Sequence, residues 1–179
     1  MLIKTVFAGF GGQGVLLMGY VLAYSAMLEG KHVTYLPSYG AEMRGGTANC
    51  VVSVSDEEIA SPVASSPDVA VIMNNPSLER FQNQILSGGV VYLNKDLISF
   101  KPLRGDIVLY EVPANTLAAG LGSDRAANMV MLGAFLKKTP LVSLDTAQEV
   151  IGRVFSDKPK LIELNSKALL AGYDSIGGE

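Results

Sequence analysis

Short apolar runs alternate along this chain with longer stretches in which apolar residues recur at helical spacing, an order typical of α/β proteins. Apolar and β-branched runs bounded by turn residues predict strands over residues 3–8, 32–36, 47–54, 69–73, 90–93 and 107–112. Helical spacing predicts helices over residues 12–29, 76–86, 124–138, 144–155 and 161–169, with a short helix and turn over 113–122.

Proline, glycine and capping residues mark where these elements should end. Pro37 closes the strand 32–36, Gly172 ends the last helix, and Arg104-Gly105-Asp106 is a turn without an assigned function. The predicted caps are Asn74 before helix 76–86, Ser123 before helix 124–138, and Asp145 with Gln148, spaced like a capping box, in helix 144–155.

A glycine-rich turn follows the first predicted strand. Gly9, Gly11 and Gly14 fit the pattern G-x-G-x-x-G between a strand and a helix, which is the context that this pattern needs. Such glycines permit a tight turn and close approach of the backbone to a ligand, and the helix N-terminus suits a phosphate or carboxylate. Gly12 adds room, and the Gln13 amide can point at a ligand or at a neighbouring chain. A tight turn that binds nothing has the same pattern.

The second predicted strand lacks a group that a dinucleotide site would need. A nicotinamide dinucleotide site places an acidic residue about 20 residues beyond the glycines to hold the ribose. Here the strand ends in Leu36-Pro37-Ser38-Tyr39, without a carboxylate and without an arginine for a 2′-phosphate. This ending argues against an ordinary dinucleotide dehydrogenase.

Residues 37–47 form a second candidate binding segment. Arg44 is the best candidate in the chain for an anion-binding side chain, because a guanidinium binds a phosphate or carboxylate through two parallel hydrogen bonds. Glu42 and Arg44 can instead pair within the loop or reach across an interface. The other candidate residues of this segment are Ser38, Tyr39, Gly45 and Gly46.

The composition suggests a chain that is buried in an assembly. Apolar residues make up 49% of the chain and charged residues only 17%, below the usual share of about 25%. The helices 12–29 and 124–138 are apolar on nearly every face, which favours contact with a partner and leaves a homodimer of the isolated chain open. Asn128 is polar within the second of these helices, so we expect it to bond to a fixed group.

Several chemistries lack the residues that they need. Cys50 is the single cysteine, so no internal disulfide or cysteine-ligated cluster is available, and we expect it to pack as a small apolar side chain. His32 is the single histidine and is expected in a loop before a strand, not as a base. A phosphate-loop motif, a catalytic triad and a paired-carboxylate site are missing. The sequence therefore favours a binding subunit over a complete enzyme.

Cellular location and fold class follow from the same patterns. The net charge of −3 gives no indication of the positively charged surface that a nucleic-acid-binding protein would need. No apolar run reaches the ~18–20 residues of a membrane span, and the start leaves no room for a signal peptide, so we expect a cytoplasmic protein without membrane contact. The predicted fold is a single domain over residues 1–179, a three-layer, doubly wound, Rossmann-like α/β fold with a mostly parallel sheet and extra C-terminal helices.

Three segments together resemble one known family. They are Gly9-Phe10-Gly11-Gly12-Gln13-Gly14, residues 37–46, and Asn128-Met129-Val130-Met131-Leu132-Gly133-Ala134. With them the chain resembles the gamma subunit of the 2-oxoacid:ferredoxin oxidoreductases, which act on pyruvate, 2-oxoglutarate, 2-oxoisovalerate or indolepyruvate. The resemblance covers residues 4–155.

The resemblance implies a part within a larger enzyme. The holoenzyme oxidatively decarboxylates a 2-oxoacid, transfers the acyl group to the substrate coenzyme A, and passes electrons to ferredoxin. Thiamine diphosphate lies between the alpha and beta subunits, with Mg in these other chains and iron–sulfur clusters in beta or in a ferredoxin-like delta subunit. The gamma module binds no cofactor tightly, is non-catalytic and packs on alpha, and in fused versions it helps to hold coenzyme A.

Two roles for the candidate residues follow from the resemblance. The glycine turn and residues 37–46 are expected side by side at the carboxyl ends of the first two strands, where ligands of open α/β sheets bind. There they hold a coenzyme A phosphate, or Tyr39, Glu42 and Arg44 dock the alpha subunit. The candidate cofactor-binding residues are Gly9, Gly11, Gly12, Gln13, Gly14, Ser38, Tyr39, Glu42, Arg44, Gly45, Gly46 and Asn128.

The expected holoenzyme acts on 2-oxoglutarate or a branched-chain 2-oxoacid. Two functions of other classes stay open. One is a free-standing nucleotide- or flavin-binding oxidoreductase built on the same turn, and the other is an interaction module whose glycine turn is empty.

Overall fold

The computed structural model describes residues 1–39, 46–61 and 65–177. The strands are β1 Leu2–Phe10, β2 His32–Tyr39, β3 Thr47–Ser55, β4 Val69–Ile72, β5 Val90–Asn94 and β6 Val108–Val112. The helices are α1 Val15–Leu28, α2 Asn75–Phe81, α3 Ala114–Gly120, the 3-10 turn η1 Asp124–Ala126, α4 Ala127–Lys138, α5 Leu144–Val154 and α6 Pro159–Ser175. Each predicted strand and helix is present, with shifted ends.

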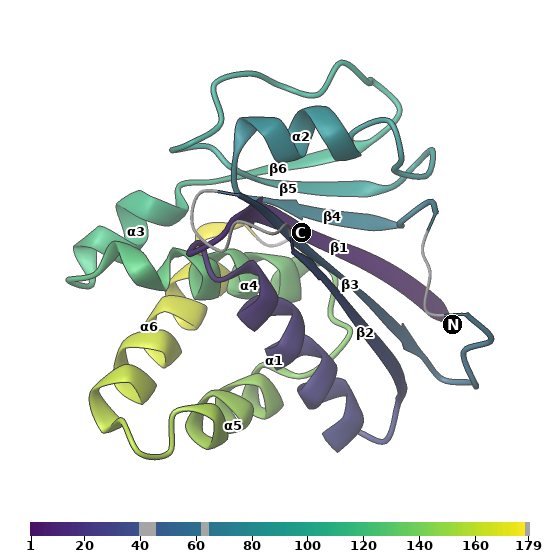
Figure 1. Ribbon diagram of the computed structural model, residues 1–179. Helices are drawn as coiled ribbons and strands as arrows, with labels where there is room; N and C mark the ends of the chain where they lie inside the picture. The colour runs from purple at the N-terminus through teal and green to yellow at the C-terminus, as the bar shows by residue number, and fades with distance from the viewer. Residues whose placement is uncertain (40–45, 62–64, 178–179) are drawn as a thin grey trace.

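Helices cover both faces of a six-stranded sheet in the order β2-β3-β1-β4-β5-β6. Helix α2 lies on one face, and α1 and α3 to α6 lie on the other (Figure 1). Strands β1, β4, β5 and β6 pair in parallel, while β3 runs antiparallel to both β1 and β2. The predicted α/β fold with a mostly parallel sheet and C-terminal helices is therefore confirmed. The antiparallel ribbon β2–β3 at one edge is its departure from a purely parallel sheet.

Pro37 does not end the second strand, contrary to the prediction. Strand β2 continues to Tyr39, and Pro37 lies opposite Cys50 of β3. Because β2 is an edge strand, no other strand of the described residues pairs with its outer side, and a residue without an N–H is tolerated there. His32 begins this strand and so does not lie in the loop before it.

Two of the predicted helix caps are wrong. Ser123 makes no side-chain cap bond, and the residues after it form the 3-10 turn η1 before α4 begins. Helix α5 is capped by Ser143, whose hydroxyl accepts the Thr146 N–H at 3.1 Å, so the spacing of Asp145 and Gln148 does not mark the cap. A serine just before the helix satisfies an N–H that the helix itself leaves unpaired.

The Asn74 cap is confirmed. Its Oδ1 accepts the backbone N–H of Ser77 at 2.9 Å, with Pro76 in the first turn of α2. The helix ends at Phe81, earlier than predicted.

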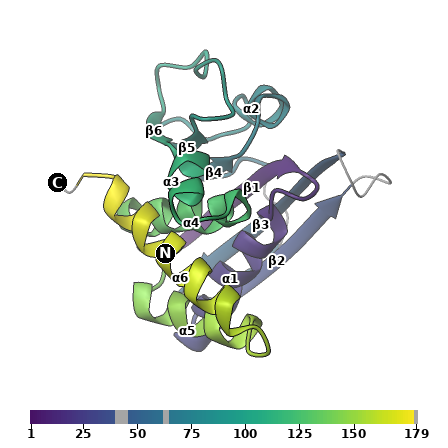
Figure 2. The same ribbon diagram turned by 90° about the vertical axis from the view of Figure 1, so that its left-hand side faces the viewer.

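Gly172 does not end the last helix, because this glycine serves helix packing. A Cβ on Gly172 would lie 1.8 Å from the carbonyl oxygen of Val130, and a Cβ on Gly133 would lie 1.9 Å from that of Leu169. The two glycines let the backbones of α4 and α6 meet, and α4 lies between the sheet and α6 (Figure 2).

Helix α4 is enclosed by its own chain, so its apolar faces do not form the partner surface that the sequence suggested. Its residues from Ala127 to Leu136 are all buried. The Phe135 ring packs against Phe7 and Tyr92 of the sheet, with centroids 5.9 and 5.7 Å apart. Helix α1 is different: it packs on the sheet but leaves Tyr20, Met27 and Leu28 exposed.

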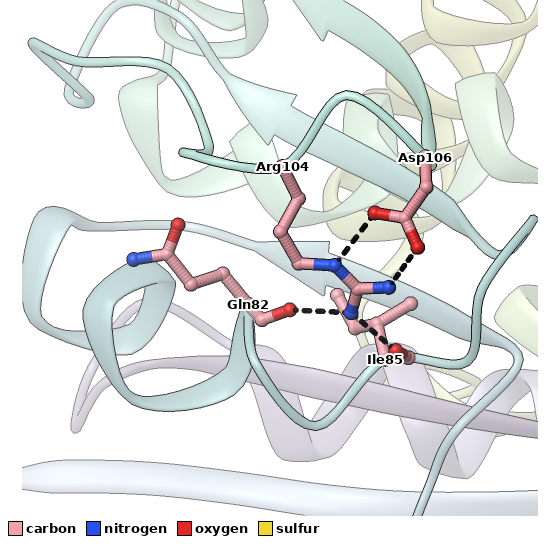
Figure 3. A network of polar contacts seen from close by, with 4 residues as sticks. All are labelled: Gln82, Ile85, Arg104 and Asp106. Carbon is pink, nitrogen blue, oxygen red and sulfur yellow. Dashed lines mark hydrogen bonds and ion pairs between the residues drawn. The ribbon is translucent and has the colours of Figure 1, made fainter.

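The Arg104-Gly105-Asp106 turn is tied into the fold by both charged side chains (Figure 3). Arg104 Nε donates to Asp106 Oδ1 at 2.8 Å, and Arg104 Nη1 donates to the carbonyls of Gln82 and Ile85. The Arg104 guanidinium holds the pKa of the Asp106 carboxyl well below its usual range. This network fastens the loop before β6 to the segment after α2.

Candidate functional site

Gln13 holds the glycine turn against the ends of two parallel strands. Its Oε1 accepts the Phe10 N–H at 2.6 Å and the Asn74 Nδ2 at 3.1 Å, and its Nε2 donates to the Met73 carbonyl at 3.4 Å. The side chain therefore joins the end of β1 to the end of β4. Both polar atoms of the amide are used within the chain, so Gln13 orients the turn.

The glycines of the turn are required by conformation and by close contacts. Gly14 is the N-cap of α1 with a left-handed φ of 73°, and Gly12 has a φ of 99°. A Cβ on Gly9 would lie 2.6 Å from Gln13 Oε1. A residue with a side chain would strain the turn or push Gln13 out of place.

Asn128 bonds to a fixed group, as predicted. Its Nδ2 donates to the Gly14 carbonyl at 3.3 Å, and its Oδ1 accepts the Met129 N–H at 2.9 Å. Asn128 is buried at the start of α4, so this bond joins the first turns of α1 and α4. Through this bond the side-chain amide of Asn128 holds the glycine turn next to α4.

The structure brings the turn beside the end of the second candidate segment. The Gly11 N–H donates to the Gly46 carbonyl at 2.8 Å, so the predicted neighbourhood is present for these two residues. Glu42, Arg44 and Gly45 lie outside the described residues. Ser38 and Tyr39 end β2, which is separated from β1 by β3, a distance of about 10 Å across two strand spacings.

A cleft of about 470 Å³ opens between the glycine turn, the first turn of α1 and the start of β3. It is lined by Phe10, Gly11, Gly12, Gly14, Val15, Leu16, Leu17, Gly46, Thr47 and Ala48. None of these described lining residues carries a charge. The cleft therefore suits an apolar or neutral group of a ligand or partner better than a phosphate held by side chains.

A smaller crevice of about 160 Å³ lies on the other side of Gly12. It is lined by Gly12, Gln13, Met73, Leu97, Asn115, Asp124, Arg125 and Ala127. Strands β1 and β4 are neighbours whose following helices pack on opposite faces, and ligands of open α/β sheets bind at such a switch point. Asp124 and Arg125 were missed by the sequence analysis, although they stand just before the helix that carries Asn128.

The strand beside β1 also argues against a dinucleotide site. On the α1 side the neighbour of β1 is the antiparallel β3, whose first residue Thr47 pairs with Phe10. In a dinucleotide fold that neighbour is a parallel strand whose end supplies the ribose-binding acid. Thr47 offers no carboxylate at this place.

Nucleophilic and metal chemistry find no support among the described residues. Cys50 is fully buried, and burial raises the pKa of its thiol to about 12, which keeps it protonated and inert. In the ranges that the structure describes, no group of three or more His, Cys, Asp or Glu side chains could hold a metal ion. None of the helices in these ranges is long and apolar enough to cross a membrane.

Fold and site together define a doubly wound α/β domain whose glycine turn lies at the switch point of the sheet and is held by hydrogen bonds from Gln13 and Asn128. Residues 4–175 match the family model described as pyruvate ferredoxin/flavodoxin oxidoreductase. The chain therefore belongs to that family, as a gamma-type subunit.

Relatives of two lengths match the chain. It is 41% identical over 174 residues to the ketoisovalerate oxidoreductase subunit VorA of Methanothermobacter thermautotrophicus, covering 96% of this chain and 36% of the relative. It is 36% identical over 176 residues to the 2-oxoglutarate synthase subunit KorC of Methanothermobacter marburgensis, covering 94% of each. The chain thus spans 36% of the length of the first relative and nearly all of the second.

Solved structures share the fold. The gamma subunit of a keto/oxoacid ferredoxin oxidoreductase from Geobacter sulfurreducens PCA matches with a TM-score of 0.81 and 29% identity, covering 97% of both chains. A 2-oxoglutarate:ferredoxin oxidoreductase from Magnetococcus marinus, solved with 2-oxoglutarate, coenzyme A and succinyl-CoA bound, matches with a TM-score of 0.89 and 26% identity. That match covers 97% of this chain and 30% of the other.

Proposed function

We propose that this chain is the gamma component of a 2-oxoacid:ferredoxin oxidoreductase complex. Such a complex couples the coenzyme A-dependent oxidative decarboxylation of a 2-oxoacid to the reduction of ferredoxin. The names of the relatives support 2-oxoglutarate or a branched-chain 2-oxoacid as the substrate. The chain works as a single domain in the cytoplasm.

One observation supports a non-catalytic role for this chain, namely that hydrogen bonds from Gln13 and Asn128 hold the glycine turn in place. Gln13 and Asn128 fix this turn from two sides, while the described residues that line the cleft and the crevice beside it include no cysteine and no histidine. Thiamine diphosphate, Mg and the iron–sulfur clusters are assigned to the alpha, beta and delta chains. The single Cys50 supports this assignment, because a cluster takes several thiolate ligands.

The glycine turn is proposed to take part in coenzyme A binding. The N–H groups of Gly11 and Gln13 already donate to Gly46 and Phe10, so Gly12 and Gly14 carry the turn N–H groups without a partner among the described residues. Arg44 is a further candidate, proposed from the sequence alone. The other role for its loop is docking of the alpha subunit.

The Arg44→Ala variant of the assembled complex separates these two roles. A higher KM for coenzyme A in an intact complex supports ligand binding. An unchanged KM together with failed assembly identifies residues 37–46 as a docking element.

The proposed function is tested by reconstitution. The chain is produced with its companion subunits, and reduction of ferredoxin is followed with 2-oxoglutarate or a branched-chain 2-oxoacid, with and without coenzyme A. We expect activity only when this chain, the 2-oxoacid and coenzyme A are all present. Turnover of a 2-oxoacid by the purified chain alone, or full activity of a complex that lacks it, would overturn the proposal.

A further inference from the structure

Asn74 is a buried side chain that bonds to two different parts of the fold. It lies between β4 and α2, and only 4% of its surface is exposed. Its Oδ1 accepts the backbone N–H of Ser77 at 2.9 Å, and its Nδ2 donates to Gln13 Oε1 at 3.1 Å. The first contact caps α2, and the second reaches the glycine turn. A cap needs only the acceptor, which a serine would also supply, so the donor half of the amide serves another purpose.

Backbone donors fix which way both side-chain amides point. The Ser77 N–H can only donate, so the Asn74 oxygen must face it and the Asn74 NH2 group faces Gln13. In the same way the Phe10 N–H requires the Gln13 oxygen. A flipped Gln13 amide would place its NH2 group against two donors, Phe10 N–H and Asn74 Nδ2. Asn74 thus favours a single orientation of Gln13.

The orientation of Gln13 determines how residues 10–13 are closed into a turn. The Gln13 N–H donates to the Phe10 carbonyl at 3.1 Å, and Gln13 Oε1 accepts the Phe10 N–H at 2.6 Å. One of these bonds is made by the backbone and the other by the side-chain amide. Gly12 lies inside the turn with a φ of 99°, and a Cβ there would meet no atom within 4 Å. Packing around Gly12 therefore does not hold the turn, and the closure by Gln13 does.

The bond between Asn74 and Gln13 joins the two connections at the switch point of the sheet. Gln13 lies before α1 and Asn74 lies before α2, and these helices are on opposite faces of the sheet (Figure 1). Their strands, β1 and β4, are parallel neighbours. Gln13 Nε2 also donates to the Met73 carbonyl, but at 3.4 Å this contact is longer and weaker. The start of α2 is thus coupled to the glycine turn chiefly through Asn74.

We propose that Asn74 is a positioning residue for the glycine turn. It holds Gln13 in the orientation that closes residues 10–13, in addition to capping α2. It acts through Gln13 and has no contact with a ligand of its own. This inference rests on the proposed function, because the turn that Asn74 positions is the part of the chain proposed there to serve coenzyme A.

Two substitutions keep the cap of α2 and remove the link to the turn. Aspartate and serine are N-cap residues of about the same quality as asparagine. Asn74→Asp places a carboxylate oxygen against Gln13 Oε1, and the side chain of Asn74→Ser is too short to reach it. Ser143→Ala is the matched control, because it removes the cap of α5, next to Glu29 at the end of α1 opposite to the glycine turn.

Steady-state reduction of ferredoxin by the assembled complex separates positioning from stability. We expect Asn74→Asp to raise the KM for coenzyme A about three- to tenfold, the factor that one neutral hydrogen bond contributes. Asn74→Ser should raise it less, and in both variants kcat and the KM for the 2-oxoacid should stay unchanged. Hydrogen exchange of residues 10–14 should be faster in both variants than in the parent. Ser143→Ala should lower the Tm and leave the KM and this exchange unchanged.

A double-mutant cycle tests whether Asn74 acts through Gln13. Gln13→Ala should itself raise the KM for coenzyme A, and adding Asn74→Asp to it should raise the KM no further. A KM equal to that of the parent in both Asn74 variants, or additive effects of the two substitutions, would overturn the inference and leave the proposed function standing. A wild-type complex that turns over a 2-oxoacid without coenzyme A would overturn the proposed function itself.

Discussion

The side-chain amide of Asn128 donates a hydrogen bond of 3.3 Å to the backbone carbonyl of Gly14, across 114 positions of the sequence. Gly14 leaves no space for a side chain at this contact, because its Cβ would lie 2.3 Å from Asn128 Nδ2. The residue that begins α1 and a residue in the first turn of α4 thus fit each other. The position of the glycine turn depends on a helix from the far end of the chain.

We expect Gly14→Ala to destabilise the fold more than Gly12→Ala. Both glycines have positive φ, so each alanine brings backbone strain of about 1–3 kcal/mol. Only the alanine at position 14 also collides with Asn128, whereas the one at position 12 meets no atom within 4 Å. The free energy of unfolding of both variants, from urea titration, measures the difference. Equal losses in the free energy of unfolding would show that the collision with Asn128 does not contribute to the effect of the Gly14→Ala substitution.

The α4–α6 contact predicts a large effect of a single methyl group. Gly133→Ala and Gly172→Ala would each place a Cβ within 2 Å of a backbone carbonyl of the opposite helix, so the helices must separate. We expect a loss of stability of about 3 kcal/mol or more, at the upper end of the range for overpacked sites.

Gly152→Ala is the matched control for this pair. Gly152 lies within α5, and its Cβ would meet no atom within 4 Å. Because alanine favours a helix by up to about 1 kcal/mol over glycine, this variant should be as stable as the parent or more stable. Thermal unfolding of the three variants gives the comparison, and a stable Gly172→Ala protein would contradict the close crossing.

The Arg104–Asp106 ion pair predicts a pH-dependent contribution to stability. The pKa of Asp106 is lowered by the hydrogen bond from Arg104, so ionised Asp106 favours the folded state. The contribution is present above the ordinary aspartate pKa of about 4 and is lost as the pH falls through the lowered value. Asp106→Asn should therefore lower the Tm at pH 7, with a difference that shrinks at strongly acid pH.

Glu111→Gln provides the control for that experiment. Glu111 pairs with Lys101 at 3.2 Å on an exposed surface, where an ion pair contributes little. The Tm of the Glu111→Gln variant should equal that of the parent protein at every pH. A constant Tm difference for Asp106→Asn across the pH range would contradict the titration of this carboxyl.

Cys50 should be unreactive in the folded protein. Burial raises the pKa of its thiol to about 12, so at pH 8 its thiolate fraction is smaller than that of a free cysteine by a factor of about a thousand or more. Iodoacetamide labelling followed by mass spectrometry should be correspondingly slow, and it should become fast in urea. Rapid labelling without denaturant would mean that β3 opens readily.

Local patterns determined much of this protein. Each predicted helix and strand exists, because hydrophobic period and glycine punctuation act within a few residues of the chain. The Asn74 cap, the glycine turn and the apolar packing of Cys50 were predicted for the same reason, and the motif blocks identified the family.

Long-range packing decided the rest. Pro37 stays inside β2 because that strand lies at the edge of the sheet, and Gly172 stays inside α6 because Val130 approaches it from another helix. The crevice with Arg125 exists only where turns after β1 and β4 meet the start of α4, an arrangement set by sheet order. Sequence periodicity fixes which face of an element is apolar, but the partner of that face is chosen by packing among segments far apart in the chain.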